Sequence, residues 1–548
     1  MSIIFGRGEP PNPGESGDKP QQGGSSSRGP RPKSGTHTFT MPDRGIETLE
    51  DAKVWVNEQI PYPNRAEEQE VAGRALNLVN EYLRRWEEST GEIREVWRAT
   101  QYELRGNVLP ARGGLDDTYV PELYKLVETA VPRLEEAILG QDPWFDVKGA
   151  KPLREQQAAK IRGFLRSQLR ADLFDHKVQP SMRCAFEYGW CCFKTTWEIR
   201  TEKRVLRDVQ KQSDERGRIR YTVKREVKEV VVWNGPRYRL CDPLDVICDP
   251  KSWLPPYDAQ WIGDQRWMTY AEIAQQGELG LFVGWEALRT RRGGAMDRTL
   301  ALSDKQDRSL SDTGVEENLR QPVAGEPAKH RVVDLWCLFD PDGSGNEVEH
   351  VITVADGWCV LRVQENPNDD KHKPFAFARF GREPWELNNV PPTGHAVLMA
   401  QEIHEHRALA LKGHRDHISP KIFAPDTQDL PDSIFDGPPG AVFQTNGPPT
   451  VVQTPSTLAD YRHMYEIQRR DMEEIIGVPR IMEGTAGGNT ATEVERKVQE
   501  GNRRLRSYVL SYSLMLEEIL RQTHALNKQW VTTDMAFRVL GKGGKGLD

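Results

Sequence analysis

Hydrophobic residues recur every three or four positions over long parts of the chain, and this spacing predicts amphipathic helices. In one such stretch the apolar stripe runs from Val71 to Trp86, and in a second Gly140 marks the end of the helix. We expect helices at about 66–97, 121–139, 153–174, 178–188, 397–421, 458–476 and 492–530. At 1.5 Å per residue, the fifth and sixth are roughly 37 and 28 Å long.

Alternation of apolar and polar residues replaces this spacing in the middle of the chain and predicts strands. Residues 190–199 and 219–223 alternate, and the polar stretch 212–217 lies between them, so we expect a long charged β-hairpin. Further strands are expected at about 237–247, 260–268, 331–339 and 349–363. Asp340-Pro341-Asp342-Gly343 has the residues of a turn between the last two. Together these elements predict an α+β fold.

Three segments show neither the helical spacing nor the strand alternation of hydrophobic residues. Residues 1–45 are rich in Gly, Pro and Ser and bury too little apolar surface to fold, so we expect disorder there. Residues 284–328 are expected to form a flexible surface insertion. The Pro- and Gly-rich stretch 425–457 contains short apolar pairs, which favours a small β-rich excursion at the tip of a helical hairpin.

Composition narrows the possible classes of protein. The 548 residues favour several domains or one multi-lobed subunit. The formal charge of -8 argues against a chain that binds nucleic acid over its whole surface. No run approaches the roughly 20 apolar residues of a membrane span. The seven cysteines lack the paired spacing of metal sites, and reduced, mostly buried thiols are expected.

Catalytic motifs are largely absent from the sequence. Residues 541–546 have the composition of a phosphate-binding loop but neither its spacing nor the Ser or Thr that follows its lysine. Residues 340–345 resemble the start of a calcium loop, but Val351 occupies the twelfth position, where a carboxylate is needed. The chain contains neither a GxSxG elbow nor an HExxH motif. We therefore expect no cofactor and no enzymatic activity.

Five histidines between 395 and 417 are the strongest candidate for metal chemistry. His414 and His417 are three residues apart on one expected helix and could share a metal ion, but no third ligand accompanies them. We favour a polar helix face that is either exposed or lines a channel. A metal-dependent hydrolase remains an alternative, and metal analysis of the purified protein separates the two.

The segment after the helix at 458–476 has an unusual composition. Pro479 ends or kinks the preceding helix, and the following residues up to 490 are rich in glycine and small polar side chains. Thr490 and Glu493 have the spacing of a capping box, which would restart a helix abruptly. A loop of this kind suits contact with something that moves past it, although a plain interhelical loop is the simpler alternative.

The order of these elements, together with several short motifs, resembles the portal proteins of tailed bacteriophages. The similarity spans about 46–530. The matching segments are 119–121, 127–134, 142–145, 185–190 with Lys194 and Trp197, 235–236, 241–246, 249–250, Gly-Val-Pro at 477–479 and Thr-Ala-Thr-Glu-Val at 490–494. The order and spacing of these motifs carry the resemblance. The insertion at 284–328 is not explained by it.

The resemblance implies a dodecameric ring around a DNA channel. It divides the chain into a wing at 46–390, stem helices at 391–424 and 458–478, a clip at 425–457, a channel loop at 479–490, a long wing helix at 491–530 and a short tail at 531–548. The C-terminal crown of the family is short or absent here, because little follows Trp530.

The resemblance also assigns candidate roles to single residues. The channel loop comprises Gly484, Thr485, Ala486, Gly487, Gly488, Asn489 and Thr490. Gly477 and Pro479 are expected at a kink of the stem, and Thr490 with Glu493 at the restart of the helix. Candidates to line the channel or the stem are His404, Arg407, His414, Arg415, Arg469 and Arg470. Clip residues expected to dock the packaging motor are Asp429, Ile434, Phe435, Val442 and Phe443.

The partners implied are further copies of the chain, double-stranded DNA in the channel, the large terminase subunit, a head-to-tail adaptor, the major capsid protein and a scaffold. No membrane partner is expected. The location implied is the virion, with the host cytoplasm during assembly. Another ring-forming connector of the head-to-tail junction is the alternative within the same class.

Overall fold

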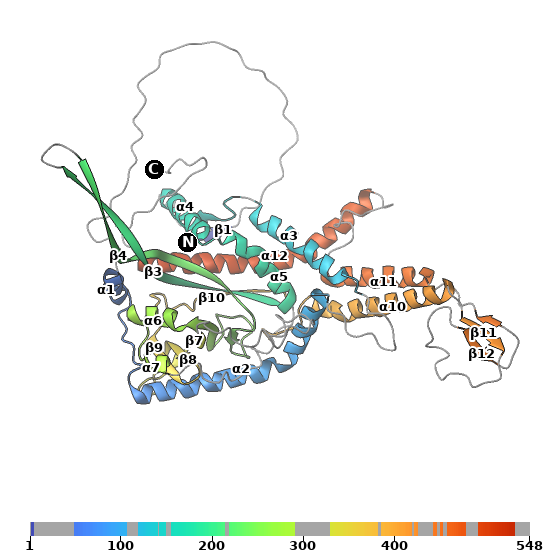
Figure 1. Ribbon diagram of the computed structural model, residues 1–548, viewed down its shortest axis with the longest axis horizontal. Helices are drawn as coiled ribbons and strands as arrows, with labels where there is room; N and C mark the ends of the chain where they lie inside the picture. The colour runs from blue at the N-terminus through green and yellow to red at the C-terminus, as the bar shows by residue number, and fades with distance from the viewer. Residues whose placement is uncertain are drawn as a thin grey trace, which may run out of the picture.

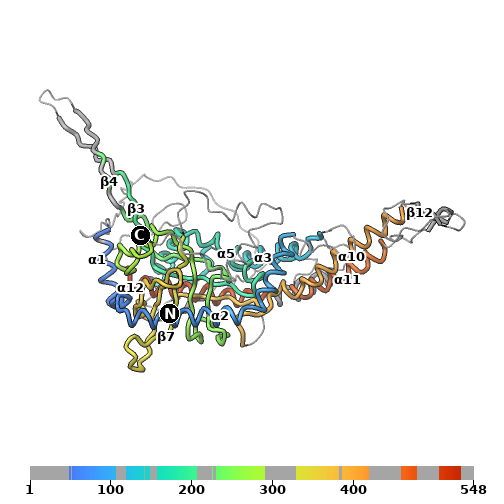
Figure 2. The backbone as a smooth tube through the Cα atoms, turned by 60° about the horizontal axis from the view of Figure 1, so that its bottom comes forward, coloured from blue at the N-terminus to red at the C-terminus, as the bar shows by residue number. Residues whose placement is uncertain are grey.

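The computed structural model describes residues 2–4, 49–106, 119–140, 142–148, 155–213, 219–290, 329–381, 385–418, 421–425, 442–445, 450–452, 458–477 and 491–531. Within these residues the protein is a mixture of α-helices and β-strands. A body of helices and sheets carries a pair of helices at one end and a long two-stranded β-ribbon at the other (Figure 1). A second view gives the same arrangement (Figure 2).

The seven expected helices are present. The helices are α1 Leu49–Gln59, α2 Gln69–Leu104, α3 Glu122–Leu139, α4 Glu155–Ala171, α5 Asp175–Tyr188, α6 Tyr270–Glu278, α7 Ala287–Thr290, α10 Gly394–Ile418, α11 Leu458–Ile476 and α12 Ala491–Trp530. Helix α2 is longer than expected because buried residues continue past Trp97 to Leu104. Helices α1, α6 and α7 were not predicted, and α7 lies at the start of the expected insertion. Residues 291–328 of that insertion lie outside the described residues.

Most strands belong to two antiparallel sheets. One has the order β10-β3-β4, with β3 Trp190–Ser213, β4 Ile219–Cys241 and β10 Phe375–Arg379. The other is a meander of β5 Val246–Cys248, β6 Trp261–Thr269, β7 Lys329–Phe339, β8 Val348–Ala355 and β9 Cys359–Glu365. The expected charged hairpin is β3 with β4, which pair from Cys192 and Cys241 out to Ser213 and Ile219.

Three expectations about extended segments are wrong. The single strand expected at 349–363 is a hairpin, because Asp356 and Gly357 adopt positive φ angles of 50° and 71° and turn the chain. The strand expected at 237–247 is interrupted where the side chain of Asp242 accepts a hydrogen bond from the amide of Leu244. Residues 2–4, expected to be disordered, form β1 (Ser2–Ile4), which pairs with β2 (Asp146–Lys148).

The turn expected at 340–343 is confirmed. Its conformation is fixed by Asp340, whose Oδ1 accepts hydrogen bonds from the amides of Asp342 and Gly343 at 3.0 and 2.9 Å. An aspartate that binds the amides two and three residues ahead is an ordinary turn device. The carboxylate of Asp340 therefore has a structural role in the chain itself.

Helix α12 crosses the body and organises its largest core. Its buried Tyr512 places its hydroxyl 2.6 Å from Ser181 Oγ on α5. The ring of Tyr508 packs against Phe186 and Phe380, with centroids 5.5 and 4.7 Å apart. Burial of aromatic side chains of this size supplies a large share of the hydrophobic free energy of folding. A second core lies between α2 and the five-stranded sheet, where Tyr82 and Trp261 stack.

Candidate functional site

The most distinctive part of the molecule is the hairpin of α10 and α11, which extends from the body and carries a small sheet at its end (Figure 1). In that sheet β11 (Lys421–Pro425) lies between β12 (Val442–Thr445), to which it is parallel, and β13 (Thr450–Val452), to which it is antiparallel. This confirms the expected β-rich excursion at the tip of a helical hairpin. We call the two helices the stem and the three strands the tip sheet.

Of the five residues expected to dock a motor, the structure describes only the backbone of two. Val442 and Phe443 lie on β12, where they pair with Ile422 and Phe423. Asp429, Ile434 and Phe435 lie outside the described residues. Their role in docking therefore stays a prediction.

The stem is fixed to the body by a buried histidine. His404 on α10 is 4% exposed, and its Nε2 lies 2.8 Å from Oε1 of the equally buried Glu103 on α2. Its Nδ1 accepts the backbone N–H of Val120 at 3.1 Å. The expectation that His404 lies on an open polar face is wrong, because both ring nitrogens are used inside the chain.

A buried carboxylate joins the second stem helix to α3. Glu122 has a side chain only 1% exposed, and its Oε1 accepts hydrogen bonds at 2.7 Å from both Tyr465 of α11 and Lys125. Burial raises the pKa of Glu122, but the hydrogen bonds from Lys125 and Tyr465 and the charge of Arg469 outweigh it and leave the pKa below its ordinary value. Glu122 is therefore held ionised between α3 and the stem.

Arg469 shares this junction. Its Nε lies 3.4 Å from Glu122 and 3.3 Å from Glu473, and its side chain is 13% exposed. It was expected to line a channel or the stem, and it pairs with carboxylates at the root of the stem. Oppositely charged groups that are this well covered are costly to separate, because each would leave the other buried without a partner.

Between the two stem helices lies a polar contact. Gln468 of α11 donates to Glu402 at 3.1 Å and contacts Nδ1 of His406, both on α10. Away from this contact, Arg407, Arg415 and Arg470 are exposed and His414 is half-buried. Among the described residues, no group of three or more His, Cys, Asp or Glu side chains is arranged to hold a metal ion.

The outer surface of the stem also carries apolar side chains that the sequence analysis did not single out. Leu409 is 52% exposed, Ile418 67% and Met464 43%. Leu409 and Ile418 belong to α10 and Met464 to α11, the two helices of the hairpin that extends from the body (Figure 2). Exposed apolar residues gathered on one projecting element are typical of a surface that meets another protein.

The structure at the end of α11 agrees in part with what the sequence predicts there. Gly477 follows α11 with a φ of 85° and donates its amide to Glu473 at 2.9 Å, a left-handed helix end that glycine adopts without strain. Pro479 and the loop up to Thr490 lie outside the described residues. Helix α12 begins at Ala491, directly after the expected loop. The capping box of Thr490 and Glu493 stays a prediction.

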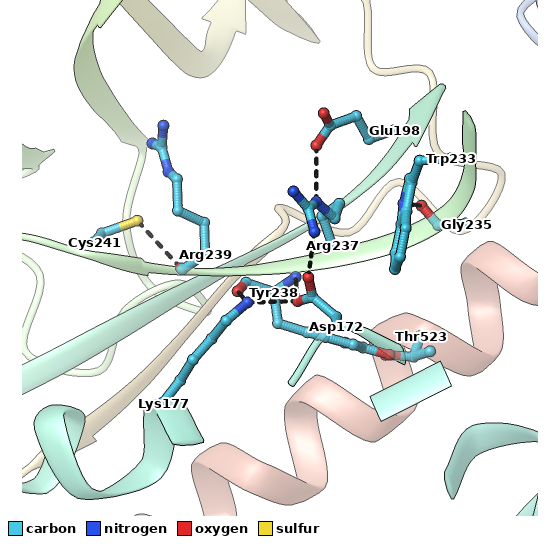
Figure 3. A network of polar contacts seen from close by, with 10 residues as sticks. All are labelled: Asp172, Lys177, Glu198, Trp233, Gly235, Arg237, Tyr238, Arg239, Cys241 and Thr523. Carbon is cyan, nitrogen blue, oxygen red and sulfur yellow. Dashed lines mark hydrogen bonds and ion pairs between the residues drawn. The ribbon is translucent and has the colours of Figure 1, made fainter. Parts of the chain in front are cut away.

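At the opposite end of the molecule the root of the β3–β4 ribbon is also fixed. Figure 3 shows Asp172, which follows α4, between Lys177 and Arg237. Its carboxylate accepts from Lys177 at 2.6 Å, from Arg237 at 2.7 Å and from the amide of Tyr238 at 2.9 Å. Since the side chain of Asp172 is 1% exposed, these contacts hold β4 firmly against the helices.

A buried ionic cluster connects the two large sheets. Lys194 of β3 lies 3.2 Å from Asp334 of β7, and it also pairs with Asp264 of β6. Burial lowers the pKa of Lys194 to about 8. Burial raises the pKa of Asp334, but the charges of Lys194 and Arg266 and a hydrogen bond from Thr353 bring it well below its ordinary value. Separating these sheets would leave buried charges unpaired.

Sequence reasoning missed Glu103, Glu122 and Asp172 because the partners that join them to other elements are distant in the chain. Glu103 and His404 are 301 residues apart, and Glu122 and Tyr465 are 343 residues apart. A local signal existed only for Glu122, a charged residue directly before the apolar stripe of α3. Within the described part of the chain, none of the helices is both long and apolar enough to span a membrane.

Comparison with known proteins does not assign the chain to a family. No protein-family model matches the sequence, and no curated protein matches it either.

Proposed function

We propose that this chain is a portal subunit of a tailed bacteriophage, with a structural rather than an enzymatic role. Such a subunit assembles into a ring at one capsid vertex, admits DNA during packaging and releases it during ejection. The observation that carries the proposal is the projecting α10–α11 hairpin, which ends in the tip sheet and is followed by a long helix across the body (Figures 1 and 2). In this proposal the body is the wing, the hairpin the stem and the tip sheet the clip.

The contacts at the root of the stem support this role. Buried polar contacts fix both stem helices to the body. His404 of α10 contacts Glu103, and Tyr465 of α11 contacts Glu122. A subunit through which DNA is driven under load needs a stem whose angle to the body is set. The exposed apolar side chains of the stem, such as Leu409 and Ile418, suit contact with neighbouring stems in a ring.

The proposed channel loop, 479–490, follows the stem directly in the sequence. Its central residues, Gly484 to Asn489, carry no charge. Each strong Lys or Arg contact to phosphate would add salt-dependent affinity for DNA. The uncharged, glycine-rich centre of the loop can touch the duplex through backbone and small polar groups without holding it, as a channel for a moving polyanion requires.

Imaging of the purified full-length protein by negative-stain electron microscopy tests the proposal. We expect rings with a central hole and an outer diameter larger than a single subunit. A protein that stays a compact monomer at micromolar concentration would overturn it. Capture of the large terminase subunit by the ring separates a portal from another head-to-tail connector, which we expect not to bind the packaging motor.

A further inference from the structure

The outer half of the β3–β4 ribbon extends away from the body, beyond the contacts of Thr201 with Gln275 and of Val231 with the core around Trp55. We call residues 201–213 and 219–231 the arm. The third strand of this sheet, β10, pairs with β3 only from Trp190 to Lys194, and the register of β3 with β4 shifts between Arg200 and Thr201. Beyond that shift the two strands leave the body on the side opposite the stem (Figures 1 and 2). Within the described residues no third strand joins this part of the ribbon, and an isolated two-stranded ribbon is marginally stable in water at best.

The arm exposes apolar side chains in a cross-strand pair. Val205 and Val227 are directly opposite each other, and they are 56% and 67% exposed. Paired β-branched residues stabilise a ribbon when a further layer covers them. In the isolated chain this pair has no such cover, and its apolar surface remains in contact with water.

The register also brings like charges together. It sets Arg204 opposite Lys228 and Arg207 opposite Arg225, while two further positions pair opposite charges, Lys203 with Glu229 and Asp208 with Lys224. Like charges in directly opposed positions destabilise a ribbon unless an anionic surface lies against them. The arm holds eight Lys or Arg and four Asp or Glu, a formal charge of +4, and since the whole chain carries -8, the remaining residues carry -12.

The root of the arm fixes its direction. Trp197 of β3 stacks on Trp530 of α12 with ring centroids 5.9 Å apart, and Trp55 of α1 packs edge-on against both. On β4, Arg237 pairs with Asp172 and with Glu198 (Figure 3). Because the ribbon is held firmly at its root, its outer half keeps a fixed angle to the body. An element that contacts a neighbouring molecule needs such a fixed direction.

We propose that the arm of one copy packs on the acidic body of the neighbouring copy and holds the two together. This inference rests on the proposed ring. The charge of +4 on the arm complements the -12 of the rest of the chain, and the Val205–Val227 pair supplies the apolar contact that a protein surface would cover. DNA is the other candidate for a basic ribbon, but an exposed valine pair and four interspersed acidic residues suit a protein surface better.

The test compares three full-length proteins by mass photometry and negative-stain microscopy over a range of concentrations. They are the wild type, the double variant Val205→Glu/Val227→Glu and the control Val348→Glu, whose side chain is 40% exposed on β8. We expect the double variant to need at least a tenfold higher concentration for the same fraction of rings, and the control to match the wild type. Circular dichroism and the thermal midpoint should show that both variants fold, because all three valines are exposed.

A second variant tests the electrostatic contribution to the contact between the arm and the neighbouring body. Arg204→Glu/Arg225→Glu should lower the ring fraction at least tenfold at about 0.15 M salt, and raising the salt to about 0.5 M should narrow its difference from the wild type. Folded double variants that form rings as the wild type does would overturn the inference while leaving the proposed function intact. Intact rings with weakened DNA binding would also overturn it, in favour of a nucleic-acid contact. Absence of rings in the wild type would overturn the proposed function itself.

Discussion

Nε2 of His404 lies 2.8 Å from Oε1 of Glu103, and the two side chains are 4% and 3% exposed. Because Nδ1 of the same ring accepts the amide of Val120, the proton resides on Nε2 and is donated to the carboxylate. One imidazole therefore joins α10, α2 and the residues that lead into α3. The first stem helix is held to the body by a contact that neither element could form alone.

Replacing His404 by alanine should destabilise the protein by about 3 kcal/mol, because the Glu103 carboxylate and the Val120 amide lose their buried partner. His395→Ala is the matched control on the same helix, since His395 is exposed, and should have almost no effect. Unfolding by urea measures both. A double-mutant cycle with Glu103→Gln should give a coupling energy of about 1 kcal/mol or more, and additive single effects would contradict the contact.

The lowered pKa of Glu122 predicts a pH dependence. The unfolded value is near 4.5, so the ionised carboxylate stabilises the fold above that pH, and this contribution is lost as the pH falls through the lower folded value. Tyr465→Phe removes one hydrogen bond to the carboxylate and should cost roughly 2 kcal/mol at pH 7. Tyr461→Phe, one turn earlier on α11, is the control. Thermal midpoints between pH 3 and pH 7 measure the effect, and equal acid profiles for Glu122→Gln and wild type would contradict it.

The proposed channel loop can be tested by two substitutions that add bulk without charge. Gly487→Val together with Gly488→Val should leave ring assembly intact and reduce the amount of DNA packaged or retained, because the loop loses conformations open only to glycine. Gly543→Val with Gly544→Val in the C-terminal tail is the control. Nuclease-protected DNA per particle is the readout, and normal packaging by the loop variant would count against a channel role.

The tip sheet should govern assembly and motor docking. Deleting Asp429 to Gly447 removes β12, which pairs along β11, and so leaves β11 and β13 as a two-stranded remnant. We expect loss of ring formation or of terminase binding. Native mass spectrometry and co-purification with the large terminase subunit measure the two outcomes. Rings of the deleted protein that still package DNA would refute the assignment of the tip sheet to docking.

Local sequence was sufficient to predict a helix or hairpin where the residue pattern of that element alone determines its structure. The residue pattern predicted a helix at about 458–476, where α11 lies, and the alternation on both sides of residues 212–217 predicted the β3–β4 hairpin. It was insufficient at the break between β8 and β9. Apolar residues continue on both sides of Asp356 and Gly357, so the periodicity alone does not show that the chain reverses there.

The sequence by itself therefore determined the seven longest of the described helices, the β3–β4 hairpin, the order of stem, tip and long helix, and the uncharged character of the residues from Gly484 to Asn489. Only the tertiary structure decided the roles of His404, Arg469 and Asp172. Hydrophobic periodicity is a property of neighbouring residues, whereas a buried charge or imidazole is defined by partners brought close from distant parts of the chain. The exposure of Val205 and Val227 is likewise a tertiary property, because it depends on where β10 stops pairing.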